Sequence, residues 1–281
     1  MIYPECTQSF LLFVDGCFCP SQSCCPKEIV VADGQITLPA GTTCETPLQI
    51  ISHSEKSEAL QLFIGQDSSL KVICSSHVTF DFQLKERAFL ELTQLSRMES
   101  LSATLQSASR FKSVHMIQGG STDYRVILAG EHATVELAGL SFLKDSHTTV
   151  FIDHQKPHTH SNQTFKGVLD GVNRSSFAGK IIIRKEAQKS QAYQKNHNLL
   201  LSDTARAISK PHLEIFADDV KASHGATVGQ LNEEHLFYLK SRGLSHERAR
   251  NLQIFGFVQE ITKQIPLITA QKEINEVVYR S

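Results

Sequence analysis

The sequence predicts a mainly β protein that ends in a helical domain. Between residues 27 and 183, short runs of β-branched and aromatic residues alternate with Gly, Asp and Ser, which is typical of strands joined by tight turns. After Gly229 this pattern stops, and capping residues followed by apolar residues at helical spacing replace it. The strands recur roughly every ten residues, which fits a sandwich, a barrel or a β-helix, and no consensus repeat chooses among these three folds.

Length and charge narrow the class of protein. With 281 residues, the chain suits one large domain, or one large and one small domain. A net charge of −1 and a pI near 6.9 argue against broad binding to nucleic acid or to an anionic membrane. Apolar runs of about five residues are far shorter than the roughly 20 needed to span a bilayer. Because no signal peptide is evident, we expect a cytoplasmic protein.

Cysteines are concentrated near the N-terminus, where five of the seven lie within the first 25 residues. Clustered thiolates can bind zinc or an iron–sulfur unit. The spacing of Cys17 and Cys19 is not the C-x-x-C of a zinc site, however, and no nearby histidine completes a ligand set. We therefore expect residues 1–26 to form a surface segment with reactive thiols and no functional metal site.

Individual strands can be placed in the first half of the chain. Apolar runs that alternate or continue between turn residues predict them. These predicted strands are Ile29–Val31, Ile36–Leu38, Leu60–Ile64, Leu70–Cys74, Val78–Phe82, Val126–Leu128 and Val135–Leu137. They belong to a predicted β-domain over residues 27–230.

The stretch 211–229 predicts two short strands joined by a turn. Leu213 and Ile215 alternate with residues of the opposite face, as in a strand with two different faces. The carboxylates at 218–219 favour a turn, because each can bond the backbone two residues further on. Val220 then begins a second extended run.

This second run carries a single histidine. Ala222 and His224 share one face, and Gly225 leaves the backbone beside the imidazole uncovered. Judged from the residues alone, a lone histidine in a strand is more often structural than a ligand.

Further histidines lie between residues 132 and 160. His158 and His160 would lie on one strand face, as in a cupin-type metal site, with His154 among the possible partners. The glutamate that a cupin pattern needs is missing, since Ser161 and its neighbours occupy that stretch. The polar residues from 153 to 163 instead favour an exposed turn with solvated histidines.

Helix signals fill residues 231–281. Asn232 caps a helix that ends at Gly243, Ser245 caps a second helix that ends before Pro266, and a short third helix follows. The second helix has an apolar face, which packs either on the chain's own β-domain or on a partner, and the residues favour the first option. This face comprises Ala249, Leu252, Phe255, Val258 and Ile261.

Several long motifs, in a fixed order, resemble the SufB/SufD family of the SUF iron–sulfur cluster assembly machinery, and its SufD branch in particular. These motifs are the runs 164–171, 198–202, 218–221, 223–229 and 237–239, followed by Ser241-Arg242-Gly243. The resemblance is clear from about residue 153 to 259 and thin before residue 104. Several ordered motifs are a more specific signal than one short pattern.

This resemblance implies a right-handed parallel β-helix over residues 27–230, with the helical domain at 231–281 and with the family's N-terminal helical domain largely absent before residue 27. It implies a scaffold that is not itself an enzyme. Its implied partners are a SufB-like subunit, or a second copy when alone, and a SufC-like ABC-type ATPase. No permanently bound metal or cofactor is expected, only a transient iron–sulfur cluster at the subunit interface.

The resemblance also implies roles for individual residues. His224 matches the family's histidine and would donate a ring nitrogen to the nascent cluster, whereas Ala222 stands where many SufD sequences have cysteine. We expect the pairing edge to be formed by Leu213, Ile215, Val220 and Val228. We expect the ATPase to dock on Phe237, Tyr238, Arg242 and Phe257.

An alternative class is a metal-dependent β-helix or cupin-like enzyme that uses His158 and His160. The chain contains no G-x-x-x-x-G-K-[ST] phosphate loop and no G-x-S-x-G elbow, so neither an ATPase nor a serine hydrolase is indicated. The scaffold hypothesis is favoured because of the family resemblance.

Overall fold

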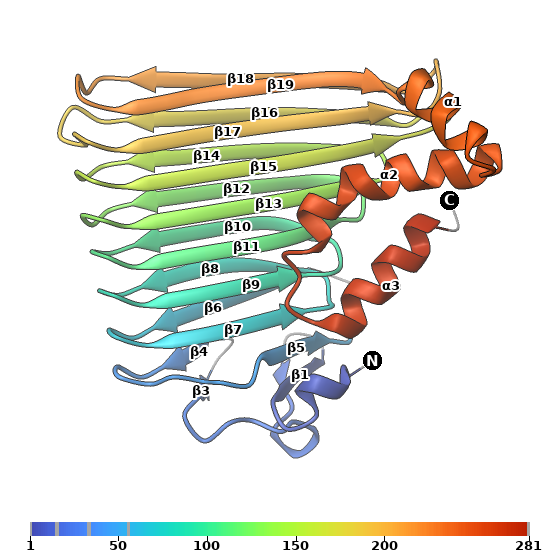
Figure 1. Ribbon diagram of the computed structural model, residues 1–281. Coiled ribbons are helices and arrows are strands. Elements are labelled where there is room, and N and C mark those ends of the chain that lie inside the picture. The colour runs from blue at the N-terminus through green and yellow to red at the C-terminus, as the bar shows by residue number, and fades with distance from the viewer. Residues whose placement is uncertain (1, 15–16, 33–34, 55–56, 280–281) are drawn as a thin grey trace.

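A computed structural model describes residues 2–14, 17–32, 35–54 and 57–279. Its strands stack in two sheets that face each other, and from the strand that begins at Gln35 onward the chain passes from one sheet to the other with each successive strand (Figure 1). The first sheet runs, in spatial order, through β19 (Lys221–Gln230), β17 (Gln191–Leu200), β15 (His160–Leu169), β13 (Thr134–Phe142), β11 (Arg110–Ile117), β9 (Phe89–Gln94), β7 (Ser69–Cys74), β5 (Leu48–Ser52), β1 (Phe10–Val14) and β2 (Cys17–Phe18). The second runs through β18 (Arg206–Ile215), β16 (Arg174–Ile183), β14 (Ser146–His154), β12 (Gly120–Leu128), β10 (Met98–Leu105), β8 (Val78–Leu84), β6 (Glu58–Ile64), β4 (Gln35–Leu38) and β3 (Val30–Ala32).

The architecture is a parallel β-helix with two strands in each coil, which confirms the predicted fold class. Neighbouring strands pair in parallel throughout, apart from the antiparallel pairs β1–β2 and β3–β4 at the N-terminal end. β1 pairs in parallel with β5, so the first sheet extends into the segment 1–26. All the strands predicted from apolar runs are present, most of them longer than predicted because polar residues continue the ladders.

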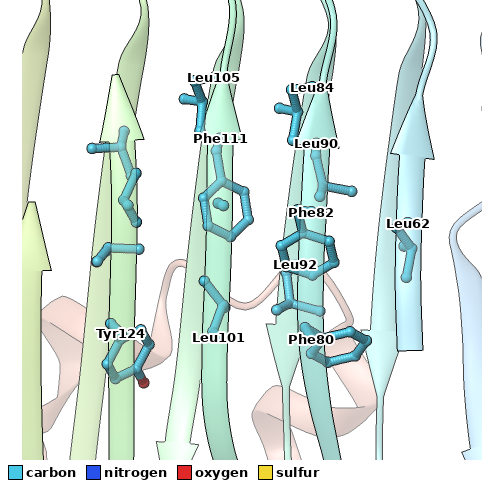
Figure 2. Close-up of a cluster of buried hydrophobic side chains, with 14 of the residues drawn as sticks. Leu62, Phe80, Phe82, Leu84, Leu90, Leu92, Leu101, Leu105, Phe111 and Tyr124 are labelled. Carbon is cyan, nitrogen blue, oxygen red and sulfur yellow. The ribbon is translucent and has the colours of Figure 1, made fainter. Parts of the chain in front are cut away.

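Apolar side chains fill the space between the two sheets. Aromatic rings pack against one another in this interior: the centroids of Phe80 and Phe82, both on β8, are 5.0 Å apart, and those of Phe82 and Phe111 on β11 are 5.3 Å apart (Figure 2). These three rings are at most 1% exposed. Burying a phenylalanine side chain stabilises a fold by about 1.5–3 kcal/mol, so this interior is the main source of stability for the middle coils.

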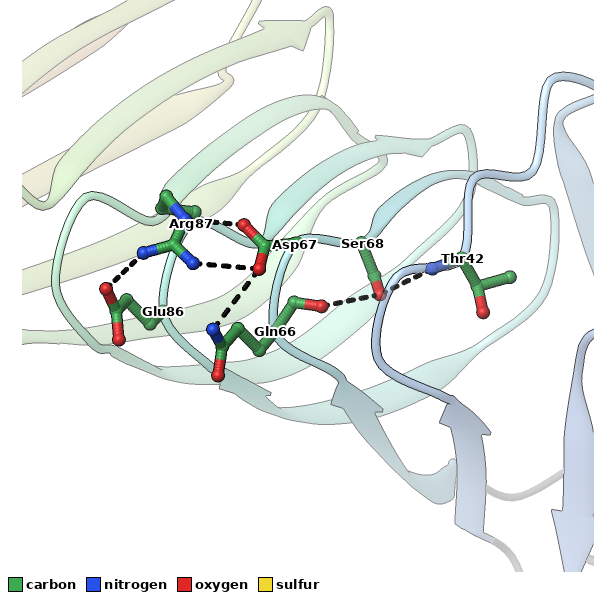
Figure 3. Close-up of polar contacts among 6 residues, drawn as sticks. All are labelled: Thr42, Gln66, Asp67, Ser68, Glu86 and Arg87. Atoms are coloured by element: carbon green, nitrogen blue, oxygen red, sulfur yellow. Dashed lines mark hydrogen bonds and ion pairs between the residues drawn. The ribbon is translucent and has the colours of Figure 1, made fainter.

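One turn of each coil has a residue in the left-handed conformation. The residues concerned are Gly41, Asp67, Arg87, Ala108, His132, His158 and Lys189. In each case the amide donates to a carbonyl of the next coil, as Asp67 N does to Glu86 O at 3.0 Å. Side chains add to this ladder: Arg87 Nη2 lies 2.8 Å from the carboxylate of Asp67 (Figure 3). The stacked turns therefore hold successive coils in register.

Three helices follow the last strand: α1 (Glu233–Ser241), α2 (His246–Thr262) and α3 (Ile268–Tyr279). The predicted caps are confirmed, because Asn232 Oδ1 accepts from the amide of His235 at 2.8 Å and the Ser245 hydroxyl accepts from Arg248 at 3.3 Å. None of the helices in the described ranges is long and apolar enough to cross a membrane.

Helices α2 and α3 cover part of the outer face of the first sheet (Figure 1). Ile254, Val258 and Ile261 of α2 are fully buried in a cluster with outward-facing residues of the sheet such as Val114 and Leu140. The apolar face of α2 therefore packs on the chain's own β-domain, as the residues favoured, except that Leu252 of the predicted face is 41% exposed.

Candidate functional site

The last coil of the β-helix is open on one side. Among the described strands, β18 pairs only with β16, and β19 pairs only with β17. These two strands form the uppermost coil in Figure 1. Each is ten residues long, and much of each is exposed. An unpaired edge of this length is a template for another strand.

Backbone hydrogen bonds show which amides point at the open edge. Phe216 N donates to Ile183 O at 2.9 Å, so even-numbered amides of β18 bond to β16 and odd-numbered amides point outward. Lys221 N donates to Ser190 O at 3.0 Å, so on β19 the even-numbered amides point outward. The amide of His224 belongs to this outward set.

His224 lies on the inner face of the open coil. It is in register with Gln194 of β17, whose side chain is buried. Inward and outward positions match between neighbouring parallel strands, so Ala222, His224 and Val228 all face the interior. The described strands place no further coil above them, and the imidazole is therefore exposed although it lies on the inner face.

The predicted pairing residues differ in exposure. Ile215 is 44% exposed and Val228 is 49% exposed, both at inward-facing positions of the open coil. Leu213 and Val220 are partly buried against the core, and Val220 lies in the connection between β18 and β19. The open end thus presents apolar side chains beside unpaired backbone groups.

The outer face of β18 is charged. Glu214 lies 2.8 Å from Lys180 Nζ and 3.2 Å from His212 Nε2. The hydrogen bond from Lys180, followed by that from His212, holds the pKa of Glu214 below its ordinary value. This charged outer rim contrasts with the apolar inner rim of the same coil.

A polar layer that was not predicted from the sequence lies directly beneath the open coil. Gln194 Nε2 donates to Gln163 Oε1 at 3.0 Å, and Asn198 Nδ2 donates to Asn196 Oδ1 at 2.8 Å. All four side chains are at most 4% exposed. The sequence does contain a sign of this layer. Every second residue from 194 to 198 is polar, so one whole face of that strand lacks the apolar side chains expected of a core strand.

Three of the predicted ATPase-docking residues lie on an exposed surface of α1 and its C-terminal cap. Phe237 is 74% exposed and Tyr238 is 55% exposed. The guanidinium of Arg242 lies 5.2 Å from the centre of the Tyr238 ring, and its Nη2 donates to the Tyr238 hydroxyl at 3.2 Å. We call these three residues the α1 patch.

Phe257 lies elsewhere, against the chain's own β-domain. Its ring packs against the apolar cluster beneath α2, and Lys166 Nζ lies 4.6 Å from the ring centre. The same ammonium donates to the Phe257 carbonyl at 2.8 Å and lies 2.6 Å from the carboxylate of Glu260. Phe257 is therefore partly buried against the β-domain, unlike the exposed residues of the α1 patch.

His158 and His160 do not share a strand face. His158 lies in a turn with a φ of 58°, and its ring stacks on that of His132 at a centroid distance of 4.7 Å. His160 is the first residue of β15 and lies beside the ring of Tyr193. No group of three or more His, Cys, Asp or Glu residues in the described part of the chain is arranged to hold a metal ion. The arrangement does not support the cupin-like alternative.

The expectation of solvated histidines between 153 and 163 is wrong for His154, which is fully buried. Its Nδ1 and Nε2 each lie 2.8 Å from a hydroxyl, that of Thr159 and that of Ser161 respectively. Thr159 in turn lies 2.8 Å from the Ser190 hydroxyl of the next coil. The polar residues face inward and bond one another, which a local pattern does not reveal.

All seven cysteines are free thiols. Cys6 is buried in the cluster beneath α3, and burial raises its pKa to about 11. Burial also raises the pKa of Cys74 to about 12. Cys17 is exposed and Cys44 is buried. The segment 1–26 is therefore only partly the surface segment with reactive thiols that we expected.

A large part of the chain matches a known protein family. Residues 26–257 match the family described as SUF system FeS cluster assembly, SufBD core domain. This range contains nearly all strands of both sheets, the open coil and most of α2.

Curated proteins similar to this chain carry related names. An iron–sulfur cluster assembly SufBD family protein of Synechocystis sp. is 43% identical over 136 residues, which cover 48% of this chain and 30% of that protein. The iron–sulfur cluster assembly protein SufD of Escherichia coli is 36% identical over 141 residues, which cover 49% and 33%. A SufBD family protein of Mycobacterium leprae is 37% identical over 151 residues, which cover 50% and 38%. The chain thus matches about a third of the length of these relatives.

Proposed function

This chain belongs to the SUF system SufBD core family, and we propose that it acts as a SufD-like scaffold in iron–sulfur cluster assembly rather than as an enzyme. It pairs through its open coil with a SufB-like subunit, or with a second copy of itself when alone, and it recruits a SufC-like ABC-type ATPase. The nascent cluster is its transient cargo. The observation that carries this proposal is the unpaired last coil with His224 on its inner face.

The open coil supports pairing on physical grounds. A partner strand added to β18 or β19 would bond the amides that now point outward, and main-chain hydrogen bonds are the source of affinity in strand addition. It would also cover Ile215 and Val228, which are both more than 40% exposed. Removing apolar surface from water contributes about 25 cal/mol per Å².

His224 supports the cargo role by its chemistry and position. A neutral imidazole is a good ligand for iron, and mixed histidine and cysteine ligation of iron–sulfur centres occurs in proteins. With Ala222 beside it, this stretch offers no thiolate of its own, so the partner supplies the cysteine. A ligand on the inner rim of the open coil would lie at the interface once a partner coil is added.

Co-expression of the chain with a SufB-like and a SufC-like protein, each tagged in turn, tests the whole proposal. We expect the untagged chain to be recovered with both partners in a defined complex. Recovery with neither partner, from cells in which all three chains are folded, would contradict the scaffold function.

Replacing Ile215 with Pro should weaken subunit pairing by tenfold or more. The Ile215 amide points at the open edge, so proline removes a donor from the new ladder without breaking a bond to β16. The dissociation constant of the pair, measured by analytical ultracentrifugation, checks this. The Ile215→Val variant keeps the donor and should pair like the unmodified chain. Equal affinities for the Pro and Val variants would rule out pairing through this edge.

Replacing His224 with Ala should leave the complex assembled but unable to build a cluster from iron and sulfide. The loss follows from removal of the imidazole on the inner rim, and it is measured by the absorbance of the reconstituted complex. His212→Ala is the matched control, because His212 lies on the outer face of the same coil and is exposed. A His224→Ala complex that builds clusters at the normal rate would remove this residue from the mechanism.

Replacing Phe237 or Arg242 with Ala should weaken capture of the ATPase, by about 2 kcal/mol where the side chain becomes fully buried on binding. The α1 patch is exposed and contains two aromatic side chains and one guanidinium. Aromatic residues and arginine are enriched among the residues that dominate binding energy at interfaces. Calorimetric titration with the ATPase measures the change. Ile268→Ala, on α3 and 64% exposed, is the control. If that control weakens capture more than the α1-patch variants do, the docking site lies on α3 instead.

A further inference from the structure

The buried amide of Gln194 is only half satisfied. Its Nε2 donates to Gln163 Oε1 at 3.0 Å, one coil below. Its Oε1 is buried and has no hydrogen-bond partner among the described residues. An unpaired buried acceptor costs about 1–3 kcal/mol, so a position of this kind favours a donor that arrives from elsewhere.

The missing donor has to come from the open coil. Gln163 and Gln194 occupy the same inward-facing position of β15 and β17, and the next residue in this column is His224 of β19. Within the column Gln194 donates to Gln163, whereas Gln163 Nε2 has no partner among the described residues. His224 is the residue directly above Gln194 in this column.

The opposite wall leaves room for this arrangement, and the one hydroxyl near it on the described strand β18, that of Ser209, is buried and unpartnered at a different position. A Cβ at Gly179 would lie 2.2 Å from Gln194 Nε2, so the Gln194 amide reaches across the interior to that glycine. The residue above Gly179 on β18 is Pro211, which has no amide hydrogen. Ser209, the nearest hydroxyl on that strand, lies above Phe177 instead.

We infer that Gln194 is a positioning residue for His224. The two side chains are not bonded in the structure, where the His224 ring is exposed; when the ring turns inward, Gln194 Oε1 accepts a hydrogen bond from one ring N–H, which fixes the tautomer and leaves the other ring nitrogen unprotonated toward the interface. Partners of this kind orient the histidines of metal sites and raise their basicity. The cargo part of this inference rests on the proposed function, whereas the hydrogen bond itself does not.

Nitrogen-15 NMR of the full-length chain, labelled at histidine and free of iron, tests the hydrogen bond. We expect His224 to show one dominant tautomer above its titration range, and Gln194→Leu to show a mixture of both. Gln194→Glu should restore the single tautomer, because a carboxylate oxygen accepts the same hydrogen bond from the ring N–H. His197, whose ring lies 2.7 Å from the Thr227 hydroxyl, is an internal control and should not change in either variant.

The unmodified chain alone can overturn this inference. If its His224 shows the tautomer mixture of free imidazole, Gln194 does not position the ring, whatever the variants do. If the tautomer changes in Gln194→Leu, iron binding at the assembled interface should weaken by about tenfold or more. A changed tautomer with unchanged iron affinity would uphold the hydrogen bond and contradict the ligand role of His224.

Discussion

Between pH 6.5 and pH 5, the free energy of unfolding should fall by about 1 kcal/mol per pH unit for each of two histidines inside the β-helix. His115 is fully buried, with Nδ1 2.5 Å from the Tyr124 hydroxyl and Nε2 3.2 Å from the carbonyl of Ser96. Burial lowers its pKa to about 4. His154 is also fully buried, and burial lowers its pKa to about 3 although Asp153 acts in the opposite direction.

The sign of this change in stability follows from the pKa of each histidine in the native and in the unfolded state. Both native pKa values lie below the unfolded value of 6.5, so the unfolded chain binds more protons in acid. The stabilisation is complete above about pH 6.5 and is lost as the pH falls toward the native pKa values. Carboxyl groups with a lowered pKa, such as Asp153 and Glu260, lose their contributions at lower pH, so the window from 6.5 to 5 isolates the histidines.

Urea unfolding at several pH values across this window measures the slope. His115→Gln and His154→Gln should each remove a large part of the slope, because each removes one fully buried ring; His197, whose pKa burial also lowers, contributes the same way in both variants. His147→Ala is the control, since His147 lies on the same strand as His154, β14, but is exposed. A stability that stays constant from pH 6.5 to 5 would mean that the two rings are not buried in the neutral form.

The helical domain could be predicted closely because its signals are local. Asn232 and Ser245 cap their helices by bonds to amides three residues away, and these bonds form whatever surrounds them. The strands were also identified, because alternation and turn residues act over a few positions. Their ends were less accurate, since a ladder continues as long as the neighbouring coil pairs with it.

The arrangement of coils could not be read from the residues, because successive coils differ in length. The left-handed turn residues are 20 positions apart at Asp67 and Arg87, and 31 apart at His158 and Lys189. A repeat of changing length produces no consensus, so the residues left sandwich, barrel and β-helix open. The family resemblance, which rests on motifs in the later coils, supplied the fold.

The interior polar residues were missed for a related reason. Histidine and glutamine usually occupy exposed positions of a strand, so His154 and Gln194 were not expected in the interior. Their hydrogen-bond partners are brought to them only by folding. Gln194 bonds a residue 31 positions earlier in the chain, which no local pattern indicates. For the same reason the sequence could identify His224 as a candidate ligand but not the amide beneath it.

Replacing Gly130 with Ala should lower the free energy of unfolding by about 3 kcal/mol or more. Gly130 lies in the turn after β12, where its amide donates to Leu105 O at 3.1 Å. A Cβ there would lie 2.0 Å from Ser107 N and 2.3 Å from Gln106 C, which are backbone atoms of the preceding coil. Backbone cannot rotate aside as a side chain can, so the two stacked turns would have to separate.

Gly225→Ala is the matched control for this substitution. Gly225 lies on β19, and an added Cβ would meet no atom within 4 Å, so the stability should change by no more than about 0.5 kcal/mol. Urea midpoints of the two variants, at equal slopes, give the comparison. Equal midpoints would show that the turns of neighbouring coils are not in close contact. A large loss for Gly130→Ala alone would show that stability in this β-helix depends on backbone-to-backbone stacking of its turns as well as on its apolar interior.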